Sequence, residues 1–511
     1  MSNWSAGYVA DIGYTFGYYA ELNPLRVKMA FLNKGLVFPE VGTACELGFG
    51  QGLSAALHAS ASVTSWYGTD FNPAQAGFAQ ELASISGSDA QLYDESFEDF
   101  AHRDDLPEFD YIGLHGIWSW ISDANRAVIV DFVRRKLKVG GVLYISYNTL
   151  PGWATFAPMR HLMTEHAEVI GSEGRGIVSR IDDAIEFAEN LIATNPMFAR
   201  ANPTVGERLK KLKEQSRHYL AHEYFNRDWH PMHFSTMADW LETAKVSYAC
   251  SASYLENIDS INLSAEQQAF MKEIPDNMFR ESVRDFMVNQ QFRKDYWVKG
   301  ARRLNPLELA ATVRAQKIVL AVYRPEVSLK VKTALGEASM NEAVYGPFLD
   351  FMADHKIRTL GEVEQHLAGH NISLAQIIEA TMVLASSGAI APAQDDAVIQ
   401  KARKHTARIN AKLRSNAHGS NDISFLASPV TGGGIMVPRF NQVFLSAISE
   451  GQKQPADWAK YAWQVLSSQN QRLIKDGKTL ETPEDNLAEL SRQADEFAQK
   501  QLPALKALQI V

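Results

Sequence analysis

Two acidic residues on either side of a glycine-rich turn form the most informative pattern in this sequence. Glu46 lies in Cys-Glu-Leu-Gly-Phe-Gly-Gln-Gly, residues 45–52, and Asp70 follows 24 residues later. Glycine at positions 48, 50 and 52 lets the backbone adopt positive φ and approach a ligand closely. A carboxylate can accept hydrogen bonds from both hydroxyls of a ribose diol. The pattern therefore predicts a nucleoside-binding site.

The position of the carboxylates also bears on which cofactor the turn would hold. The nicotinamide dinucleotide fingerprint is G-x-G-x-x-G, and this chain has Leu53 where the third glycine should be. Glu46 precedes the turn, where a carboxylate would repel a pyrophosphate. S-adenosylmethionine carries an amino group and a sulfonium and has no phosphate, so the pattern favours this cofactor. The remaining alternative is an ordinary glycine turn in another kind of α/β domain.

Apolar runs that alternate with helical patterns surround these carboxylates and predict a mostly parallel sheet. Parallel strands place their carboxyl ends at one edge, where ligands of open α/β sheets bind. The expected strands are Val41–Cys45, Val63–Thr69, Ala90–Tyr93, Phe109–Leu114 and Val142–Tyr147, with Val246–Ala252 and Phe292–Val298 as the last two. The expected helices are Leu25–Asn33 after Asn23-Pro24, Leu53–Ala61, Pro73–Ser84 and Asn125–Leu137, the last of which Gly140-Gly141 would stop.

The length of 511 residues predicts more than one domain. We expect a first domain over residues 1–300, with a helical insertion or cap over 155–235, and a mainly helical second domain over 301–511. Residues 345–395 have the order of elements of a winged helix, but Ile372–Ser387 contains no Lys or Arg to neutralise phosphates. This segment is therefore expected to contact protein or to mediate dimerisation.

Composition excludes several classes of protein. The net charge of −9 argues against nonspecific nucleic-acid binding as the main activity. Cys45 and Cys250 are the two cysteines, and we interpret both as buried thiols in a reducing compartment.

The sequence shows no signal peptide and no apolar run long enough to span a membrane. These features predict a cytoplasmic protein without a membrane span.

A group of histidines raises the question of a metal site. His222-Glu223 does not begin an H-E-x-x-H motif, because Asn226 occupies the second histidine position. No cysteine or carboxylate pair completes a ligand set. We therefore predict no metal, and expect this helix to pack its aromatic face over the cofactor cleft. The histidines concerned are His218, His222, His230 and His233.

Taken together, six segments resemble bacterial class I S-adenosylmethionine-dependent methyltransferases that carry a methyltransferase regulatory domain. His115-Gly-Ile-Trp-Ser-Trp120 and Asn148-Thr-Leu-Pro-Gly-Trp153 are the most specific parts of this likeness, which covers nearly the whole chain. The resemblance implies a Rossmann-like seven-stranded α/β domain with a helical insertion, followed by a mainly α domain with a winged-helix segment. The segments are Gly13–Tyr19, Glu46–Gly52, Phe109–Trp120, Leu137–Tyr147, Tyr147–Trp153 and Tyr219–Phe225.

The resemblance also implies which residues would hold the cofactor. The glycine turn and Glu46 would hold the methionine and ribose end, and Asp70 would bind the ribose hydroxyls. Phe71 could stack on adenine, and Ser96 and Phe97, which follow the third strand, would lie along the edge of the adenine ring. The expected cofactor-binding residues are Glu46, Gly48, Phe49, Gly50, Gly52, Asp70, Phe71, Ser96, Phe97 and His115; for Phe97, core packing is an equally good interpretation.

The acceptor side is expected where the fourth strand ends. His115 would face the methyl group there, although a structural turn histidine before Gly116 is the alternative. Tyr14, His115 and Tyr147 are the candidates for guiding a proton. Tyr18, Trp118 and Trp120 are expected to line the substrate side, with Tyr14 in the same aromatic wall, because aromatic faces attract cations such as a sulfonium or an ammonium. Packing in the core is the alternative for these aromatic residues.

The sequence thus predicts a methyltransferase that uses S-adenosylmethionine. Because relatives of this architecture include lysine methyltransferases of bacterial outer-membrane proteins, the first-choice acceptor is a lysine side chain of a protein. The alternatives are a small-molecule N- or O-methyltransferase and a regulator that binds the cofactor without turnover. The second domain would serve substrate docking or homodimerisation.

Overall fold

A seven-stranded mixed sheet forms the centre of the molecule. The structure is a computed structural model that describes residues 13–171 and 173–511. The strand order is β3-β2-β1-β4-β5-β7-β6, with β7 antiparallel to both of its neighbours. This confirms the expected seven-stranded sheet, including its last two strands. The strands are β1 (Thr43–Leu47), β2 (Ser65–Thr69), β3 (Ala90–Tyr93), β4 (Phe109–Leu114), β5 (Leu137–Asn148), β6 (Val246–Ser251) and β7 (Phe292–Lys299).

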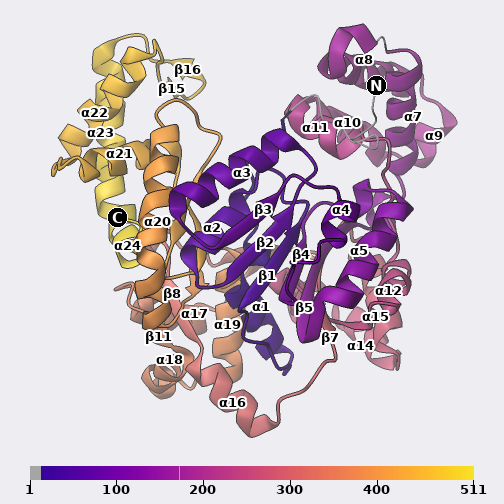
Figure 1. Ribbon diagram of the computed structural model, residues 1–511, viewed down its shortest axis with the longest axis horizontal. Helices are drawn as coiled ribbons and strands as arrows, with labels where there is room; N and C mark the ends of the chain where they lie inside the picture. The colour runs from indigo at the N-terminus through magenta and orange to yellow at the C-terminus, as the bar shows by residue number, and fades with distance from the viewer. Residues whose placement is uncertain (1–12, 172) are drawn as a thin grey trace.

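Helices cover both faces of the sheet (Figure 1). On one face they enclose a core with Leu47, Ile112 and Trp297, and on the other they pack against Trp66 and Tyr144. The helices of the first face are α4 (Phe97–Ala101), α5 (Asp123–Lys136) and α12 (Phe234–Glu242). Those of the second are α1 (Pro24–Asn33), α2 (Leu53–Ala61) and α3 (Pro73–Ser86).

Most of the expected elements around the glycine turn are present, and the differences have local causes. The Asn23 side chain caps α1 by accepting from the N–H of Leu25, as Asn-Pro sequences commonly do at a helix start. The expectation that Gly140-Gly141 stops a helix is wrong. α5 already ends at Lys136, and the two glycines lie within β5, where Gly140 has a φ of 86° and the pairing with β4 shifts register. The prediction was wrong because glycine is typical both of the end of a helix and of a bulge in a strand.

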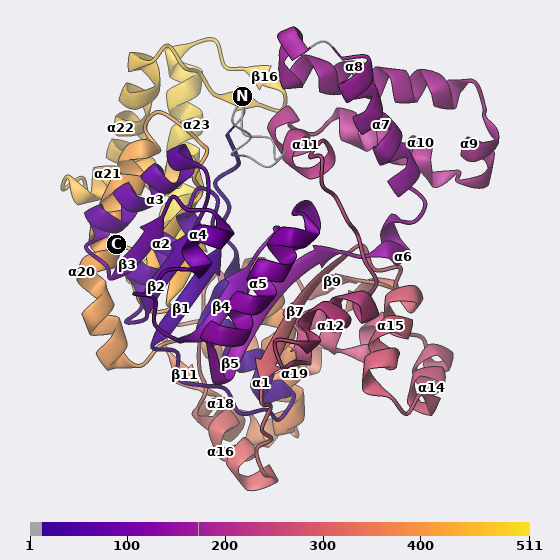
Figure 2. The same ribbon diagram turned by 45° about the vertical axis from the view of Figure 1, so that its right-hand side comes forward.

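A helical lobe stands out from the sheet where β5 ends. It has its own core, which includes Trp153, Ile181 and Leu209. Figure 2 shows this lobe at the upper right, with α11 as its helix nearest the sheet. Its helices are α7 (Ala157–Val169), α8 (Gly176–Ala193), α9 (Met197–Ala201), α10 (Thr204–Lys213) and α11 (Arg217–Tyr224).

The C-terminal half is mainly helical, as expected, and packs on the α1–α3 side of the sheet (Figure 1). Its first part has a three-stranded sheet of β8 (Lys317–Leu320), β11 (Arg358–Thr359) and β12 (Ile390–Pro392) in the order β11-β8-β12. Three helices accompany this sheet: α17 (Glu342–Met352), α18 (Leu360–Leu367) and α19 (Leu374–Ser386). The long helix α20 (Asp396–Asn416) then lies against α2 and α3.

The two halves meet closely at the glycine run 432–434, which begins just before β14 (Gly433–Met436), the partner strand of β13 (Phe425–Ser428). A Cβ at Gly433 would lie 2.3 Å from the Tyr18 hydroxyl oxygen, and one at Gly434 would lie 3.0 Å from Leu57. The Asn23 side-chain amide donates to the Thr431 carbonyl. The glycines therefore allow the C-terminal half to pack directly on the segment that leads to α1 and on α2.

Candidate active site

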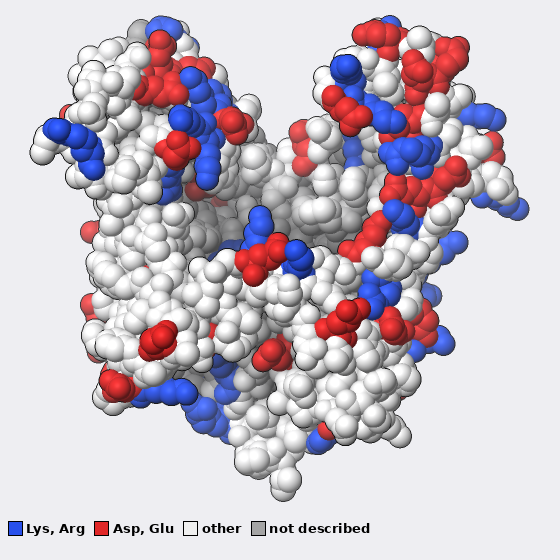
Figure 3. Space-filling view, turned by 180° about the vertical axis from the view of Figure 1, so that it is seen from behind, with Lys and Arg blue, Asp and Glu red and all other residues white. Residues whose placement is uncertain are grey.

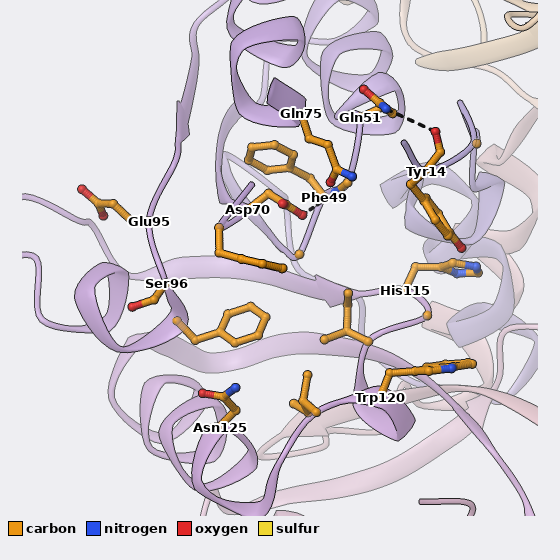
Figure 4. A pocket seen from close by; sticks show the side chains of 18 of the residues that line it. Tyr14, Phe49, Gln51, Asp70, Gln75, Glu95, Ser96, His115, Trp120 and Asn125 are labelled. Carbon is orange, nitrogen blue, oxygen red and sulfur yellow. Dashed lines mark hydrogen bonds between the residues drawn. The ribbon is translucent and has the colours of Figure 1, made fainter. Parts of the chain in front are cut away.

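A pocket lies at the carboxyl ends of β1, β2 and β4, the ligand-binding edge of such a sheet. Its empty volume is about 1240 Å³, part of it open to solvent. Figure 4 shows Asp70 and Ser96 toward one end and Tyr14, His115 and Trp120 toward the other. The long cavity thus has room for an extended ligand with two chemically different ends.

The glycine turn forms one wall of this pocket. Gly48, Gly50 and Gly52 all have positive φ, between 58° and 69°. The N–H of Gly48 donates to the Thr69 carbonyl at 2.8 Å, which ties the turn to β2. Gly52 begins α2 in the left-handed conformation and lies outside the pocket lining, because it packs against Ala79 of α3. The role of Gly52 is therefore to shape the turn.

Asp70 connects the turn to the end of β2. Its Oδ2 accepts from the N–H of Gly50 at 2.9 Å and its Oδ1 accepts from the N–H of Asn72 at 3.0 Å. Burial raises the pKa of this carboxyl to about 6, although both backbone hydrogen bonds lower it. Asp70 therefore fixes the turn and presents the remaining lone pairs of a carboxylate to the pocket.

Glu46 is buried at 2% exposure behind the turn and does not line the pocket itself. Burial, and then the neighbouring Asp70, raise the pKa of Glu46 to about 8. Its Oε2 has no hydrogen-bond partner in the described residues. A buried acceptor without a partner fits a site completed by a donor from a ligand, such as a hydroxyl or an amino group.

The opposite wall near Asp70 is more apolar. Phe71 and Phe97 both line the pocket, as do Ser96 and Asn125. The Ser96 hydroxyl oxygen accepts from the N–H of Asp99 and so caps α4. Flat aromatic side chains next to polar ones suit a heteroaromatic base such as adenine.

His115 is enclosed by tyrosines at the far end of the pocket. Its ring stacks on Tyr19 with 3.6 Å between centroids, and its Nδ1 lies 2.7 Å from the Tyr144 hydroxyl. Burial lowers the pKa of His115 to about 3. The imidazole is therefore neutral at physiological pH and is held in one orientation.

Three separate segments meet beside His115. The Tyr14 hydroxyl donates to Oε1 of Glu223 at 3.3 Å, and Trp120 Nε1 donates to the Glu223 backbone carbonyl at 3.3 Å. Burial raises the pKa of Glu223 to about 7, against the lowering effect of the Tyr14 hydrogen bond. The lobe helix α11 thereby places a carboxyl group behind Tyr14 and Trp120 at this end of the pocket.

Besides Glu46 and Gly52, which lie behind the turn and in it, three of the expected catalytic and substrate residues do not line the pocket. Tyr147 donates to Oδ2 of Asp295 at 2.8 Å in the buried core. Trp118 is fully buried with its Nε1 on the sulfur of Met232. Tyr18 pairs with His58 at 3.1 Å under the C-terminal half. Tyr147 and Trp118 are corrected to core residues, and Tyr18 to a half-buried residue packed against the C-terminal half, because each hydroxyl or indole N–H already has a buried partner.

Several residues of the pocket were not expected from the sequence. Tyr19 had only its place beside Tyr18 as a signal; Glu223, which lies behind the pocket wall, had only its place in a histidine-rich segment. Ile117 and Ile121 line the pocket from the segment around Trp120, and Gln75 lies on α3. In the part of the chain that the structure describes, no group of three or more His, Cys, Asp or Glu side chains could hold a metal ion.

The fold and the site together define a class I methyltransferase. A family model described as a methyltransferase domain matches residues 45–145, and one described as a predicted methyltransferase regulatory domain matches residues 216–299. The chain is 39% identical over 512 residues to an uncharacterized protein of Synechocystis sp. (sll1526), with 99% of both chains covered. It is 25% identical over 288 residues to an uncharacterized protein of Rickettsia prowazekii (RP789), which covers 54% of this chain and 49% of that one.

The chain belongs to the class I S-adenosylmethionine-dependent methyltransferases that carry a methyltransferase regulatory domain, and it is an enzyme of this class. The fold is similar over its full length to PKMT2 from Rickettsia typhi. The structure of that protein in complex with AdoHcy has a TM-score of 0.67 at 17% identity, covering 97% of this chain and 99% of that one. A second structure of PKMT2 gives a TM-score of 0.68. The expected class of enzyme is confirmed.

Proposed function

We propose that this methyltransferase transfers methyl groups from S-adenosylmethionine to lysine side chains of a protein. The observation that carries the proposal is the chemistry of the pocket end beside His115. Tyr14 and Trp120 present aromatic faces there, next to the Glu223 carboxyl. No Lys or Arg lines the pocket among the described residues, whereas Asp228 does. Such surroundings attract a cation.

The roles of the cofactor-binding residues are part of the proposal. S-adenosylmethionine supplies a methyl group that a sulfonium activates. Asp70 would accept from the ribose hydroxyls, and Phe71 with Phe97 would enclose the adenine. The glycine turn would lie along the methionine, and Glu46 would accept from a donor on that end. His115 is neutral, and its proposed role is to orient the methionine end and the acceptor.

Transfer to an amine requires little more than a correct approach. The acceptor nitrogen must present its lone pair in line with the carbon–sulfur bond that breaks, and positioning supplies most of the rate gain in such reactions. A lysine ammonium, with a pKa of about 10.4 in water, must first lose a proton. Exclusion of water by the aromatic end favours the neutral amine.

The shape of the molecule supports an acceptor of protein size. Figure 3 shows a broad hollow between two lobes, the helical lobe of α7–α11 and the C-terminal helices. We propose that residues 1–300 form the catalytic domain, with 155–235 as its cap, and that residues 301–511 serve substrate docking or homodimerisation. No helix among residues 13–171 and 173–511 has the length and hydropathy to cross a bilayer. Buried free thiols at Cys45 and Cys250 support the proposal that the enzyme works in the cytoplasm.

The test is transfer of a radiolabelled methyl group from S-adenosylmethionine into a lysate of the source organism. We expect label in a discrete protein band and, after hydrolysis, in methylated lysine. The Asp70→Ala variant should lose the label, and Asp94→Asn, an exposed carboxylate near the same sheet edge, should retain it. Label confined to small molecules would contradict the protein acceptor and favour a metabolite N- or O-methyltransferase.

A further inference from the structure

The carboxyl group of Glu223 lies behind Tyr14 at the acceptor end of the pocket, and the proposed function gives it no step in the reaction. It belongs to α11 of the helical lobe, whereas Tyr14 comes from the segment before α1 and Trp120 from the segment after β4. His218 of the same helix hydrogen-bonds to the Gly13 carbonyl through Nδ1 at 3.3 Å. The lobe thus holds this carboxyl in place through contacts with two parts of the catalytic domain.

We infer that Glu223 and Tyr14 form a pair that recognises the primary ammonium group of the acceptor and takes up its proton, an inference that rests on the proposed amine acceptor. The Tyr14 hydroxyl donates to Glu223, and Tyr14 also shares a side-chain hydrogen bond with Tyr19. A phenol oxygen that donates its own proton to a carboxyl group can still accept from an ammonium through a lone pair. Tyr14 also lines the pocket, whereas Glu223 lies behind it. Tyr14 is therefore the contact, and Glu223 is the positioning residue that acts through it.

The electrostatic surroundings of Glu223 suit reversible protonation. Burial raises the pKa of its carboxyl to about 7, and the Tyr14 hydrogen bond opposes this. Tyr19 from the segment before α1 and Tyr219 from α11 also interact with it, and burial raises the pKa of both to about 12. The His222 ring also lies against Tyr14, with 5.0 Å between ring centroids. An arriving cation would favour the ionised form of Glu223.

The proton balance of the step is simple. The ammonium gives one proton to the Tyr14 oxygen as the Tyr14 hydroxyl passes its own proton to the Glu223 carboxylate. The products are a neutral amine, an unchanged tyrosine and a protonated carboxyl group. The amine lone pair then forms the new carbon–nitrogen bond while the carbon–sulfur bond breaks, and that electron pair remains on sulfur. Glu223 afterwards releases its proton to solvent.

The other groups of the pocket are less suited to this role. His115 remains neutral, since burial lowers its pKa to about 3, and its Nδ1 is engaged by Tyr144. Asp70 lies toward the opposite end, where its oxygens hold the glycine turn. Asp228 lies next to Arg227 and His230, 3.6 Å from each. Asp228 lines the pocket, but Glu223 is the carboxyl group that is hydrogen-bonded to the Tyr14 hydroxyl of the pocket wall.

The decisive experiment measures binding of n-butylammonium, which has the end group of a lysine side chain, to the enzyme saturated with AdoHcy. Titration calorimetry at pH 8 and pH 6 compares the wild type with Glu223→Gln. With a pKa near 7, about nine-tenths of Glu223 is ionised at pH 8 and about one-tenth at pH 6. We expect the wild-type affinity to fall about tenfold at pH 6, and the variant to bind at least about tenfold more weakly at pH 8 without this pH dependence.

Controls separate recognition from structure. Glu207→Gln removes an exposed carboxylate of the same lobe and should bind n-butylammonium as the wild type does. The neutral 1-pentanol should bind wild type and Glu223→Gln alike, and AdoHcy affinity should be unchanged, because the bond from Trp120 goes to the Glu223 backbone. If Glu223→Gln does not fold, Tyr14→Phe should show the same loss.

Two results would overturn the inference: no binding of n-butylammonium to the wild type, or equal affinity and equal pH dependence in Glu223→Gln. Failure of the proposed function looks different. In that case the lysate assay labels no protein lysine, while n-butylammonium still binds in the manner expected of the Tyr14–Glu223 pair.

Discussion

Replacement of Asp70 tests the cofactor site most directly. In the structure its two oxygens hold the N–H groups of Gly50 and Asn72 at 2.9 and 3.0 Å, and in the proposed complex they also accept from two ribose hydroxyls. A hydrogen bond to a charged group contributes about 1.5–3 kcal/mol. Loss of the two ribose bonds in Asp70→Ala should thus cost about 3–6 kcal/mol, which is roughly a 10²- to 10⁴-fold weaker Kd. Asp70→Asn keeps one acceptor oxygen and should lose about half of this free energy.

Calorimetric titration with AdoHcy measures these affinities and their dependence on pH. The pKa of Asp70 is raised to about 6 in the free protein, and the ligand favours the ionised form. Wild-type affinity should therefore be constant above pH 6 and should fall by up to about tenfold per pH unit below it. The affinity of Asp70→Asn for AdoHcy should not change with pH over this range. Binding by Asp70→Asn within threefold of the wild type, or wild-type affinity that does not change between pH 7 and 5, would refute the assignment.

Three further substitutions test the parts around the site. Because the folded-state pKa of Glu46 is raised to about 8, ionisation opposes folding as pH rises. Between pH 5 and 8, the free energy of unfolding of Glu46→Gln should therefore increase relative to that of the cofactor-free wild type by up to about 1.4 kcal/mol per pH unit, as measured by urea unfolding. Tyr147→Phe removes the buried bond to Asp295 and should lower the free energy of unfolding by about 1–3 kcal/mol while kcat stays within twofold; a large loss of kcat at unchanged stability would restore a catalytic role. Gly52→Ala should lower the melting temperature markedly, because Gly52 has a φ of 67° and its new Cβ would lie 2.3 Å from Cβ of Ala79. Gly77→Ala should not lower it, because the space around Gly77 is open.

The elements around the glycine turn could be predicted from the sequence because their signals are local. Ala90–Tyr93, Phe109–Leu114 and Leu53–Ala61 were expected with the bounds that the structure has. Apolar runs of strand length and a helix of small residues define these elements without distant contacts. Where a residue type serves two purposes, prediction failed: Gly140 forms a bulge in β5 instead of ending a helix.

The acceptor end of the site shows what local patterns leave undecided. Tyr144 and Tyr147 both lie on β5, but side chains alternate between the faces of a strand. Tyr144 consequently reaches His115, while Tyr147 points into the opposite core and meets Asp295. Tyr18 and Tyr19 differ in the same way, one under the C-terminal half and the other in the pocket. Which neighbour faces the ligand depends on packing that the sequence pattern does not specify.

Local sequence is enough to predict the class of this protein, because Glu46, the glycine turn and Asp70 follow one another within a single strand–helix–strand unit. Short-range contacts and chain direction set their geometry. The acceptor end depends instead on long-range packing. Tyr14, Trp120 and Glu223 come from segments about a hundred residues apart in the sequence, and no local pattern relates their positions. They meet because the helical lobe packs its own core and then sets α11 across the open end of the sheet.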